Sequence, residues 1–325
     1  MKGKITLEDH FAIDATLGDS RQFGSHVWDE LSRRLLDIQD QRLRRMDESD
    51  VELMVLSLNA PAVQVVRDVN AAIELARRAN DFLADQVRRR PDRLAGLAAL
   101  PMQDPDAAAA ELQRAIKELG FKGALVNGFS ELGERDSPLY YDLPRYRGFW
   151  SVVESLGFPF YLHPRNPLPG HLTAYDDHPW LLGPTWAFAA ETAVHALRLI
   201  GSGLFDEHPD LKIILGHLGE GLPFYLWRID NRNVWMKAAH KYAARKPVAD
   251  YFLAHFYLTT SGHFSSPALL DAMAEIGSDR IMFSVDYPFE DVGDAARWFD
   301  AAPISEEDRA RIGRTNALRL FRLER

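Results

Sequence analysis

Eight short apolar segments alternate with longer amphipathic segments along this chain, and this alternation constrains its fold more than any other feature. Helical periodicity marks the intervening segments, for example 70–89, 107–119 and 187–205, and a closing amphipathic helix is predicted at 316–325. Strands that alternate with helices indicate an α/β fold with a parallel sheet. The strands are predicted at residues 4–10, 51–58, 94–101, 122–128, 158–164, 212–219, 256–261 and 281–288.

Several predicted strands are almost continuously apolar, as in VELMVLSL and KIILGHLG. Such runs are typical of parallel strands whose outer face is covered by helices. Eight strands that alternate with helices therefore favour a closed (β/α)8 (TIM) barrel. A doubly wound open sheet is the alternative, but no glycine-rich nucleotide-binding motif follows the first strand. Because no linker rich in Pro, Gly or Ser divides the chain, residues 1–325 are expected to form a single catalytic domain.

Composition excludes several classes of function. With 47 acidic and 38 basic side chains the net charge is −9, which argues against nucleic acid or an anionic membrane as a partner. The absence of cysteine excludes disulfides, thiolate metal ligands and cysteine nucleophiles. The opening MKGKITLEDH lacks the apolar run of a signal peptide, and no segment approaches the roughly 20 apolar residues of a membrane span. We therefore expect a cytoplasmic enzyme.

Two segments between predicted elements are unusually long. Residues 11–27 follow the first predicted strand, and residues 165–185, rich in Pro, Gly and aromatic side chains, follow the fifth. Long loops in a compact domain are often lids or binding loops. Both segments follow the carboxyl end of a strand, which is the catalytic face of a barrel.

Ionisable side chains recur where predicted strands end. Glu8 and His10 end the first strand on one face, because residues i and i+2 of a strand point the same way. His163 ends the fifth strand, His217 the sixth and Asp286 the eighth. Each of these residues, taken alone, is best interpreted as a hydrogen-bonded core residue. Together at one edge of a barrel they would be costly to bury unless a cation or a substrate compensates them.

Glu8, His10, His163 and Asp286 form a set of imidazole and carboxylate ligands. Such a set suits one borderline or hard divalent cation, and we expect Zn²⁺, with Mn²⁺ as the alternative. Glu220 lies three residues after His217, where it could orient the imidazole and raise its basicity. Glu220 could instead complement a helix N-terminus ahead of Pro223, and the two roles are compatible.

Four further residues are weaker candidates for substrate contacts. Asn127, at the end of the fourth strand, could bond to substrate or simply form a turn with Gly128. Arg228 could neutralise an acidic substrate or form a surface ion pair. Phe23 and Phe289 could be aromatic walls of a site, although most phenylalanines are core residues.

These motifs together resemble the amidohydrolase superfamily, and more narrowly its non-oxidative decarboxylases. The resemblance rests on ITLEDHF, on His163 in FYLHP, on GHLGEGLPF, on FSVDYP and on the terminal GRTNALRLF, in matching order along essentially the whole chain. Superfamily hydrolases commonly carry His-x-His on strand 1 and, when binuclear, a bridging lysine on strand 4. Here Glu8 replaces the first histidine and strand 4 ends in Asn127, which favours a mononuclear decarboxylase.

The resemblance implies a reaction and a role for each candidate residue. It implies reversible loss of CO2 from an ortho-hydroxybenzoate, with 2,6-dihydroxybenzoate foremost and 2,3-dihydroxybenzoate or salicylate as alternatives. The four ligands would bind the metal. Asp286, assisted by His217 and Glu220, would deliver the proton, and His217 as imidazolium is the alternative acid. Similar enzymes are commonly tetramers.

The resemblance also implies which side chains contact the substrate. The ring or its substituents would be contacted by Phe23, Asn127, Arg228 and Phe289. Two rival functions stay open at this point. One is a mononuclear hydrolase of a lactone, ester or amide, and the other is a metal-stabilised binding protein without catalytic activity.

Overall fold

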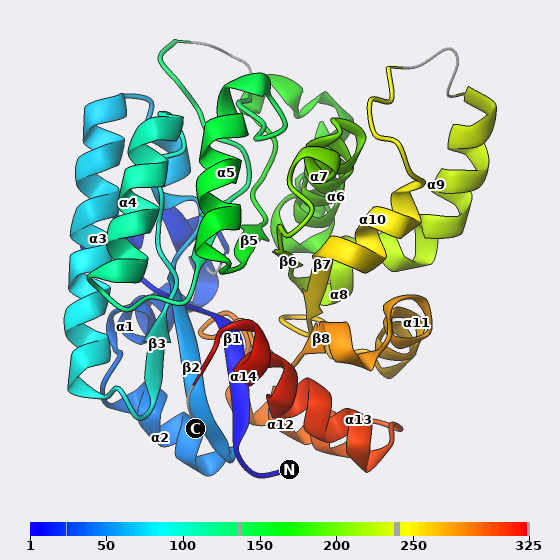
Figure 1. The fold of residues 1–325 in the computed structure, drawn as a ribbon. Coiled ribbons are helices and arrows are strands. Elements are labelled where there is room, and N and C mark those ends of the chain that lie inside the picture. Colours follow the sequence, from blue (N-terminus) through cyan, green and yellow to red (C-terminus); the bar gives the residue numbers. More distant parts are fainter. Residues whose placement is uncertain (24, 135–137, 237–240, 324–325) are drawn as a thin grey trace.

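Parallel strands form the centre of the molecule. The computed structural model describes residues 1–23, 25–134, 138–236 and 241–323, apart from the side chains of residues 23 and 25. Figure 1 shows these strands surrounded by helices. Within the described residues there are eight strands: β1 (Lys4–Phe11), β2 (Val51–Leu58), β3 (Leu94–Gly96), β4 (Ala124–Asn127), β5 (Phe160–His163), β6 (Ile213–Leu215), β7 (Phe256–Thr259) and β8 (Ile281–Met282).

The strands follow one another in sequence order, and every pairing is parallel. They form the runs β1-β2-β3 and β4-β5-β6-β7-β8. A parallel bridge between Ala98 and Ala124 joins β3 to β4. At the other seam, the backbone N–H of His10 donates to the carbonyl of Tyr287 at 2.6 Å, which ties β1 to the segment after β8. The predicted (β/α)8 barrel is confirmed.

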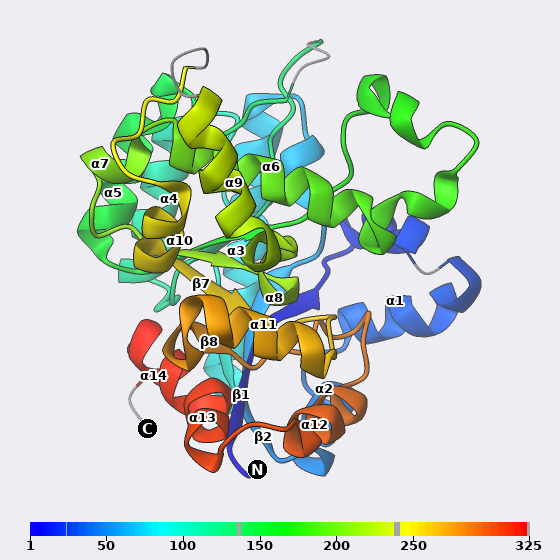
Figure 2. The same ribbon diagram turned by 90° about the vertical axis from the view of Figure 1, so that its right-hand side faces the viewer.

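Helices cover the outside of the barrel (Figures 1 and 2). Local sequence marks where several of them begin: the Asp68, Asp104 and Asp291 side chains each accept from backbone N–H groups of the first turn. The helices are α1 (Trp28–Leu36), α2 (Gln41–Glu48), α3 (Val69–Arg89), α4 (Pro105–Lys117), α5 (Arg147–Leu156), α6 (Ala187–Gly201), α7 (Leu204–Glu207), α8 (His217–Glu220), α9 (Leu222–Met236), α10 (Val248–His255), α11 (Ser266–Ile276), α12 (Val292–Ala301), α13 (Glu306–Ala310) and α14 (Asn316–Leu320).

Alternation along the strands separates an inner from an outer core. The outer core lies between strands and helices and includes Met54 and Val126. The inner core fills the barrel, and α14 contributes to it, so this short helix closes the end of the barrel opposite the carboxyl ends of the strands. The inner core consists of Ile5, Leu7, Leu53, Val55, Ala95, Leu97, Leu125, Tyr161, Ile214, Met282, Ala317, Leu320 and Phe321.

Six strands are shorter than the sequence predicted, and three of them end several residues early. Strand β3 ends at Gly96, β6 at Leu215 and β8 at Met282, instead of at 101, 219 and 288. The prediction was wrong there because continuous apolar character reports burial, and these buried segments extend beyond the regular strands. His217 consequently begins the short, irregular α8 after β6, and Asp286 begins the turn that follows β8. The closing helix is also shorter than predicted, and residues 324–325 lie outside the described part.

The two long segments after β1 and β5 contain short 3₁₀ helices. Residues Leu17–Phe23 and Ser25–Val27 form two of them, and four more lie between Pro169 and Thr185. Figure 2 shows both segments projecting on the same side of the barrel, next to α1. None of the helices in the described residues is both long and apolar enough to cross a membrane.

Gly123 offers a test of how tightly the strands approach one another. Its φ is +143°, and a β-carbon there would clash with the carbonyl oxygen of Pro159, which accepts the hydrogen bond from Ala124 N. We predict that Gly123→Ala lowers the free energy of unfolding by about 2–4 kcal/mol, measured by chemical denaturation.

Gly120 is the matched control for that substitution. Its φ is +75°, but apart from Gly120 and its two chain neighbours no atom of the described residues would lie within 4 Å of a β-carbon there. Gly120→Ala should therefore cost only the backbone conformation, about 1 kcal/mol. Equal losses in the two variants would show that the contact with Pro159 is unimportant.

Candidate metal centre and active site

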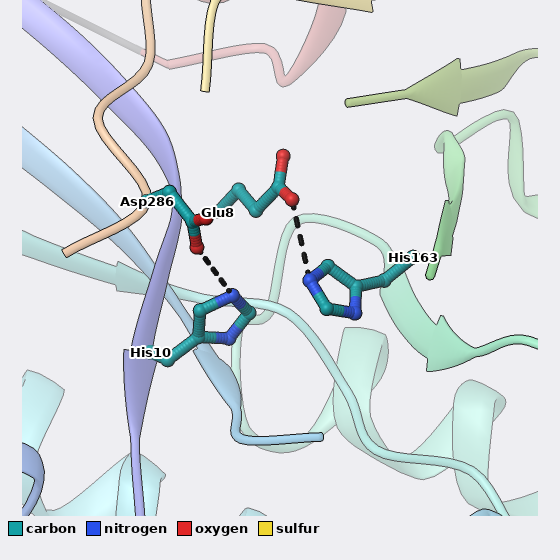
Figure 3. Close-up of side chains that lie close together, drawn as sticks. All are labelled: Glu8, His10, His163 and Asp286. Carbon is teal, nitrogen blue, oxygen red and sulfur yellow. Dashed lines mark ion pairs between the residues drawn. The ribbon is translucent and has the colours of Figure 1, made fainter. Parts of the chain in front are cut away.

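Four ionisable side chains converge at the carboxyl ends of the strands (Figure 3). Glu8, His10, His163 and Asp286 each offer a ligand atom, and these atoms all lie within 4.8 Å of one another. His10 Nε2 is 3.1 Å from Asp286 Oδ1, and His163 Nε2 is 3.3 Å from Glu8 Oε1. The structure thus brings together the four residues that the sequence predicted as metal ligands.

An irregularity in β1 turns Glu8 and His10 towards this cluster. Ile5 and Leu7 belong to the inner core, so strict alternation would point Glu8 and His10 outwards to the helices. The register of β1 against β2 shifts at this point, and Glu8 has a φ of +58°. The bulge therefore exchanges the two faces of the strand. The shared face was predictable from the spacing, but this exchange was not.

On β5 the alternation is undisturbed. Tyr161 belongs to the inner core, and His163, two residues later, lies on the same face and reaches the cluster. On β2 the inner residues Leu53 and Val55 are followed in the same way by Ser57, whose hydroxyl lies 3.2 Å from His10 Nδ1. That contact leaves His10 Nε2 free for another ligand.

Several atoms of the cluster are buried without a hydrogen-bond partner in the described part of the chain. They are Glu8 Oε1, His10 Nε2, His163 Nδ1 and Asp286 Oδ1. Buried polar atoms are rarely left unpaired, because their desolvation is then uncompensated. Three of these atoms, Glu8 Oε1, His10 Nε2 and Asp286 Oδ1, face one another across the cluster. Imidazole nitrogens and carboxylate oxygens in this arrangement fit a single divalent cation.

The second carboxylate oxygen of Glu8 is held by hydroxyl groups. Glu8 Oε2 accepts hydrogen bonds from Tyr161, Ser261 and Thr259. Sequence reasoning missed all three residues. The available signal was spacing: Tyr161 lies two residues before His163, and Thr259 and Ser261 share one face at the end of β7. The hydroxyls orient Glu8 so that Oε1 faces the histidines.

Electrostatics keep the cluster ready to bind a cation. Burial alone would raise the pKa of Glu8, but the neighbouring His217, His163 and His10 hold it well below its usual range. Burial lowers the pKa of His163, against the opposing effect of Glu8. An ionised carboxylate and a neutral imidazole are the forms that bind metals.

His217 and Glu220 form a pair beside the cluster. His217 Nδ1 lies 2.8 Å from Glu220 Oε1, as the sequence predicted for a carboxylate that orients this imidazole. His217 Nε2 lies 3.6 Å from Glu8 Oε1 and 3.7 Å from Asp286 Oδ2. Burial acts to lower the pKa of His217, but Glu220, Glu8 and Asp286 raise it well above the usual value.

Backbone strain concentrates at these residues. Among the described non-glycine residues with positive φ are Glu8 (+58°), His217 (+50°), Glu220 (+56°) and Asp286 (+76°). This region is disfavoured for residues with a β-carbon, at about 1–3 kcal/mol each. The strained turns bring Glu8, His217 and Asp286 close together, and Glu220 contacts the far nitrogen of His217.

A cavity of about 430 Å³ opens above the cluster. His163, His217 and Asp286 lie at its base, and Phe289 and Phe188 form aromatic walls. Its remaining lining comes from the segment after β1 with α1, from the loop after β2, from the segment after β5 and from the turn after β8: His26, Val27, Glu30, Leu31, Arg34, Ala60, Pro184, Pro288 and Glu290. Both long segments therefore border the site, as their positions predicted.

The four predicted substrate contacts differ in position. Phe289 lines the cavity. Asn127 is buried at the end of β4, and its Nδ2 donates to the carbonyl of Asn59 at 3.1 Å. Arg228 is exposed on α9 and is not among the described residues that line the cavity. The side chain of Phe23 lies outside the described part.

Comparison with known proteins assigns the family. A model of the amidohydrolase family matches residues 24–323. The chain belongs to the amidohydrolase family. This amidohydrolase is 62% identical over 325 residues to the gamma-resorcylate decarboxylase of Rhizobium sp. (strain MTP-10005), and the match spans 100% of this chain and 99% of that protein.

Two solved structures are similar over the same length. A 2,6-dihydroxybenzoate decarboxylase complexed with 2,6-dihydroxybenzoate is 62% identical, with a TM-score of 0.97, over 99% of this chain and 100% of that chain. A dihydroxybenzoic acid decarboxylase from Polaromonas sp. JS666, with bound manganese and the inhibitor 2-nitroresorcinol, is 61% identical, with a TM-score of 0.98, over 100% and 98%.

The hydroxyl of Tyr161 provides a test of the support for Glu8. We predict that Tyr161→Phe weakens binding of a divalent cation by about tenfold, because it frees a carboxylate oxygen from the hydroxyl that orients it. Competition with a chelator measures this affinity. Tyr141→Phe is the matched control, since the Tyr141 hydroxyl is equally buried but pairs with Ser130, 3.0 Å away. Unchanged affinity in Tyr161→Phe would contradict the predicted support.

Proposed function

We propose that this amidohydrolase catalyses the reversible, non-oxidative decarboxylation of 2,6-dihydroxybenzoate (γ-resorcylate) to resorcinol and CO2. One observation carries the proposal: Glu8, His10, His163 and Asp286 meet at the base of a cavity with aromatic walls. The full-length similarity to decarboxylases of dihydroxybenzoates supports the same substrate class, a small aromatic carboxylate. We also propose that residues 1–325 act as one catalytic domain.

Glu8, His10, His163 and Asp286 would hold one divalent cation, Zn²⁺ or Mn²⁺. Manganese in the similar Polaromonas enzyme supports the second of these. When bound, the cation would hold the substrate carboxylate and the adjacent phenolic oxygen and would polarise the ring. Phe289 would pack against the ring, while contacts from Phe23, Asn127 and Arg228 stay predictions.

A chain of three side chains would handle the proton. Glu220 holds Nδ1 of His217, and Nε2 of His217 lies 3.7 Å from Asp286 Oδ2. Asp286 would deliver a proton to the ring carbon that bears the carboxylate, and that carbon becomes tetrahedral. The carbon–carbon bond then breaks, its electron pair restores the aromatic ring, and CO2 leaves. His217 would return a proton to Asp286, or would itself act as the acid.

We propose that the enzyme is a homotetramer. Helix α9 supports association, because it exposes large apolar side chains, with Phe224, Trp227 and Trp235 each more than 70% exposed. Exposed apolar surface of this kind marks interfaces between proteins.

Asp286→Asn tests the proposed acid. We expect decarboxylation to be abolished while a substantial share of the metal is retained, because an amide cannot deliver the proton but its oxygen still offers a ligand. Turnover by absorbance and metal content by elemental analysis measure the two effects. Asp294→Asn on the surface of α12 removes the same charge and should behave as wild type. Near-normal turnover in Asp286→Asn would exclude Asp286 as the acid.

His217→Ala separates a role in proton transfer from a role as a ligand. We expect most activity to be lost with the metal content intact, since the four predicted ligands are untouched. Kinetics and metal analysis on the same preparation provide the measurement. Loss of the metal in this variant would instead make His217 a ligand.

A substrate panel tests the reaction itself. The purified enzyme with analysed metal content is assayed by ultraviolet absorbance against 2,6-dihydroxybenzoate, 2,3-dihydroxybenzoate and salicylate, and against representative lactones and esters. We expect a clear preference for the 2,6 isomer with release of CO2. Hydrolysis without CO2 release would replace the decarboxylase by a mononuclear hydrolase, and no activity on any hydroxybenzoate would overturn the proposed function.

A further inference from the structure

A fully buried arginine lies directly behind the metal-binding cluster. Arg42, on α2, is 0% exposed. Its Nη2 donates to the carbonyl oxygen of His10 at 2.5 Å, and its Nε donates to the carbonyl oxygen of Asp37 at 3.3 Å. Its guanidinium carbon also lies 4.7 Å from the centre of the Tyr287 ring. Arg42 thus contacts one cluster residue and the neighbour of another.

These contacts lie at the seam where the barrel closes. His10 ends β1 and Asp286 follows β8, and their ligand atoms are 3.1 Å apart. Between them, His10 N–H donates to Tyr287 C=O at 2.6 Å. Arg42 secures the next peptide group of β1: it holds the His10 carbonyl while its guanidinium packs on the Tyr287 ring. Displacement of the His10 carbonyl or of the Tyr287 ring would change the distance between His10 Nε2 and Asp286 Oδ1.

The charge of Arg42 has unusual surroundings. No carboxylate of the described residues is paired with it within ion-pair distance, and its Nη1 has no hydrogen-bond partner there. Two carboxylates act on this charge without pairing with the guanidinium: the buried Asp9, and Asp37, whose Oδ2 accepts from the Arg42 backbone N–H at 3.2 Å. Asp9 itself accepts from the Thr6 hydroxyl and from Tyr287 N–H. Burying a guanidinium that is held by carbonyl groups and an aromatic ring costs free energy, and the groups that hold Arg42 are concentrated at the seam.

We propose that Arg42 is a positioning residue that holds His10 and the Tyr287 segment together and so sets the spacing of two metal ligands. It touches neither metal nor substrate. The inference rests on the proposed metal-binding role of the cluster. Replacing Arg42 should therefore lower the metal affinity, and it should lower turnover only as a consequence of that loss.

Arg42→Met tests the proposal, because methionine fills part of the space but donates no hydrogen bond. The holoenzyme is placed in competition with a chelator, and the dissociation constant of its metal is compared with that of the wild type. We expect affinity to fall by about tenfold or more, the effect typical of losing a group that orients a ligand. Arg42→Lys keeps the charge and one donor, so it should recover part of this loss.

Arg309 provides a matched control for loss of a buried arginine. It is buried on α13, donates to the carbonyls of Phe299 and Ala302, and lies 5.9 Å from the Phe299 ring. None of these partners belongs to the cluster or adjoins it in sequence. Arg309→Met should lower Tm as Arg42→Met does, but its metal affinity should stay within about twofold of wild type.

Three outcomes would overturn the proposal. The first is a metal affinity of Arg42→Met within about twofold of wild type. The second is a loss of metal affinity in Arg309→Met that equals the loss in Arg42→Met. If Arg42→Met does not fold, Arg42→Lys is compared with Arg309→Lys, and equal metal affinity in these two is the third. Failure of the proposed metal site is distinguishable, because the wild-type protein itself would then bind no metal, and failure of the proposed reaction appears in the substrate panel and not in the metal affinity.

Discussion

The burial of unpaired ligand atoms at one end of the barrel is the constraint on which the rest of the structure depends. Glu8, His10 and Asp286 each keep a buried atom without a partner in the described part of the chain. Such an arrangement costs stability unless a bound cation compensates it. The surrounding residues keep these atoms from pairing with other groups: hydroxyls hold the far oxygen of Glu8, and Ser57 contacts the far nitrogen of His10.

The bulge in β1 has consequences on both sides of the strand. It turns Glu8 and His10 to the inside, and it leaves Asp9 buried on the outside. Burial raises the pKa of Asp9 to about 7, although the Thr6 hydroxyl, Arg42 and His10 act in the opposite direction. Arg42 occupies the same outer layer. A single backbone irregularity therefore explains both the inward ligands and the burial of Asp9 behind them.

The two ends of the barrel differ in what their residues do. At one end α14 and the residue that follows it place Ala317, Leu320 and Phe321 in the inner core, so apolar packing closes the barrel and stabilises it. At the other end strained turns, long segments and a cavity of about 430 Å³ replace that packing. This division is general for barrels, whose catalytic groups lie at the carboxyl ends of the strands.

Sequence alone determined the fold class and the members of the cluster. Apolar runs of strand length, separated by helical periodicity, specify the barrel, and ionisable residues directly after such runs specify which side chains meet at its mouth. Spacing also indicated the pairing of His217 with Glu220. Only the tertiary structure decided that β6 and β8 end before His217 and Asp286, that β1 exchanges its faces at Glu8, and that Tyr161 and Arg42 support the ligands. The physical reason is that local patterns report burial and periodicity, whereas strand register, positive φ and contacts between distant segments depend on how the whole chain packs.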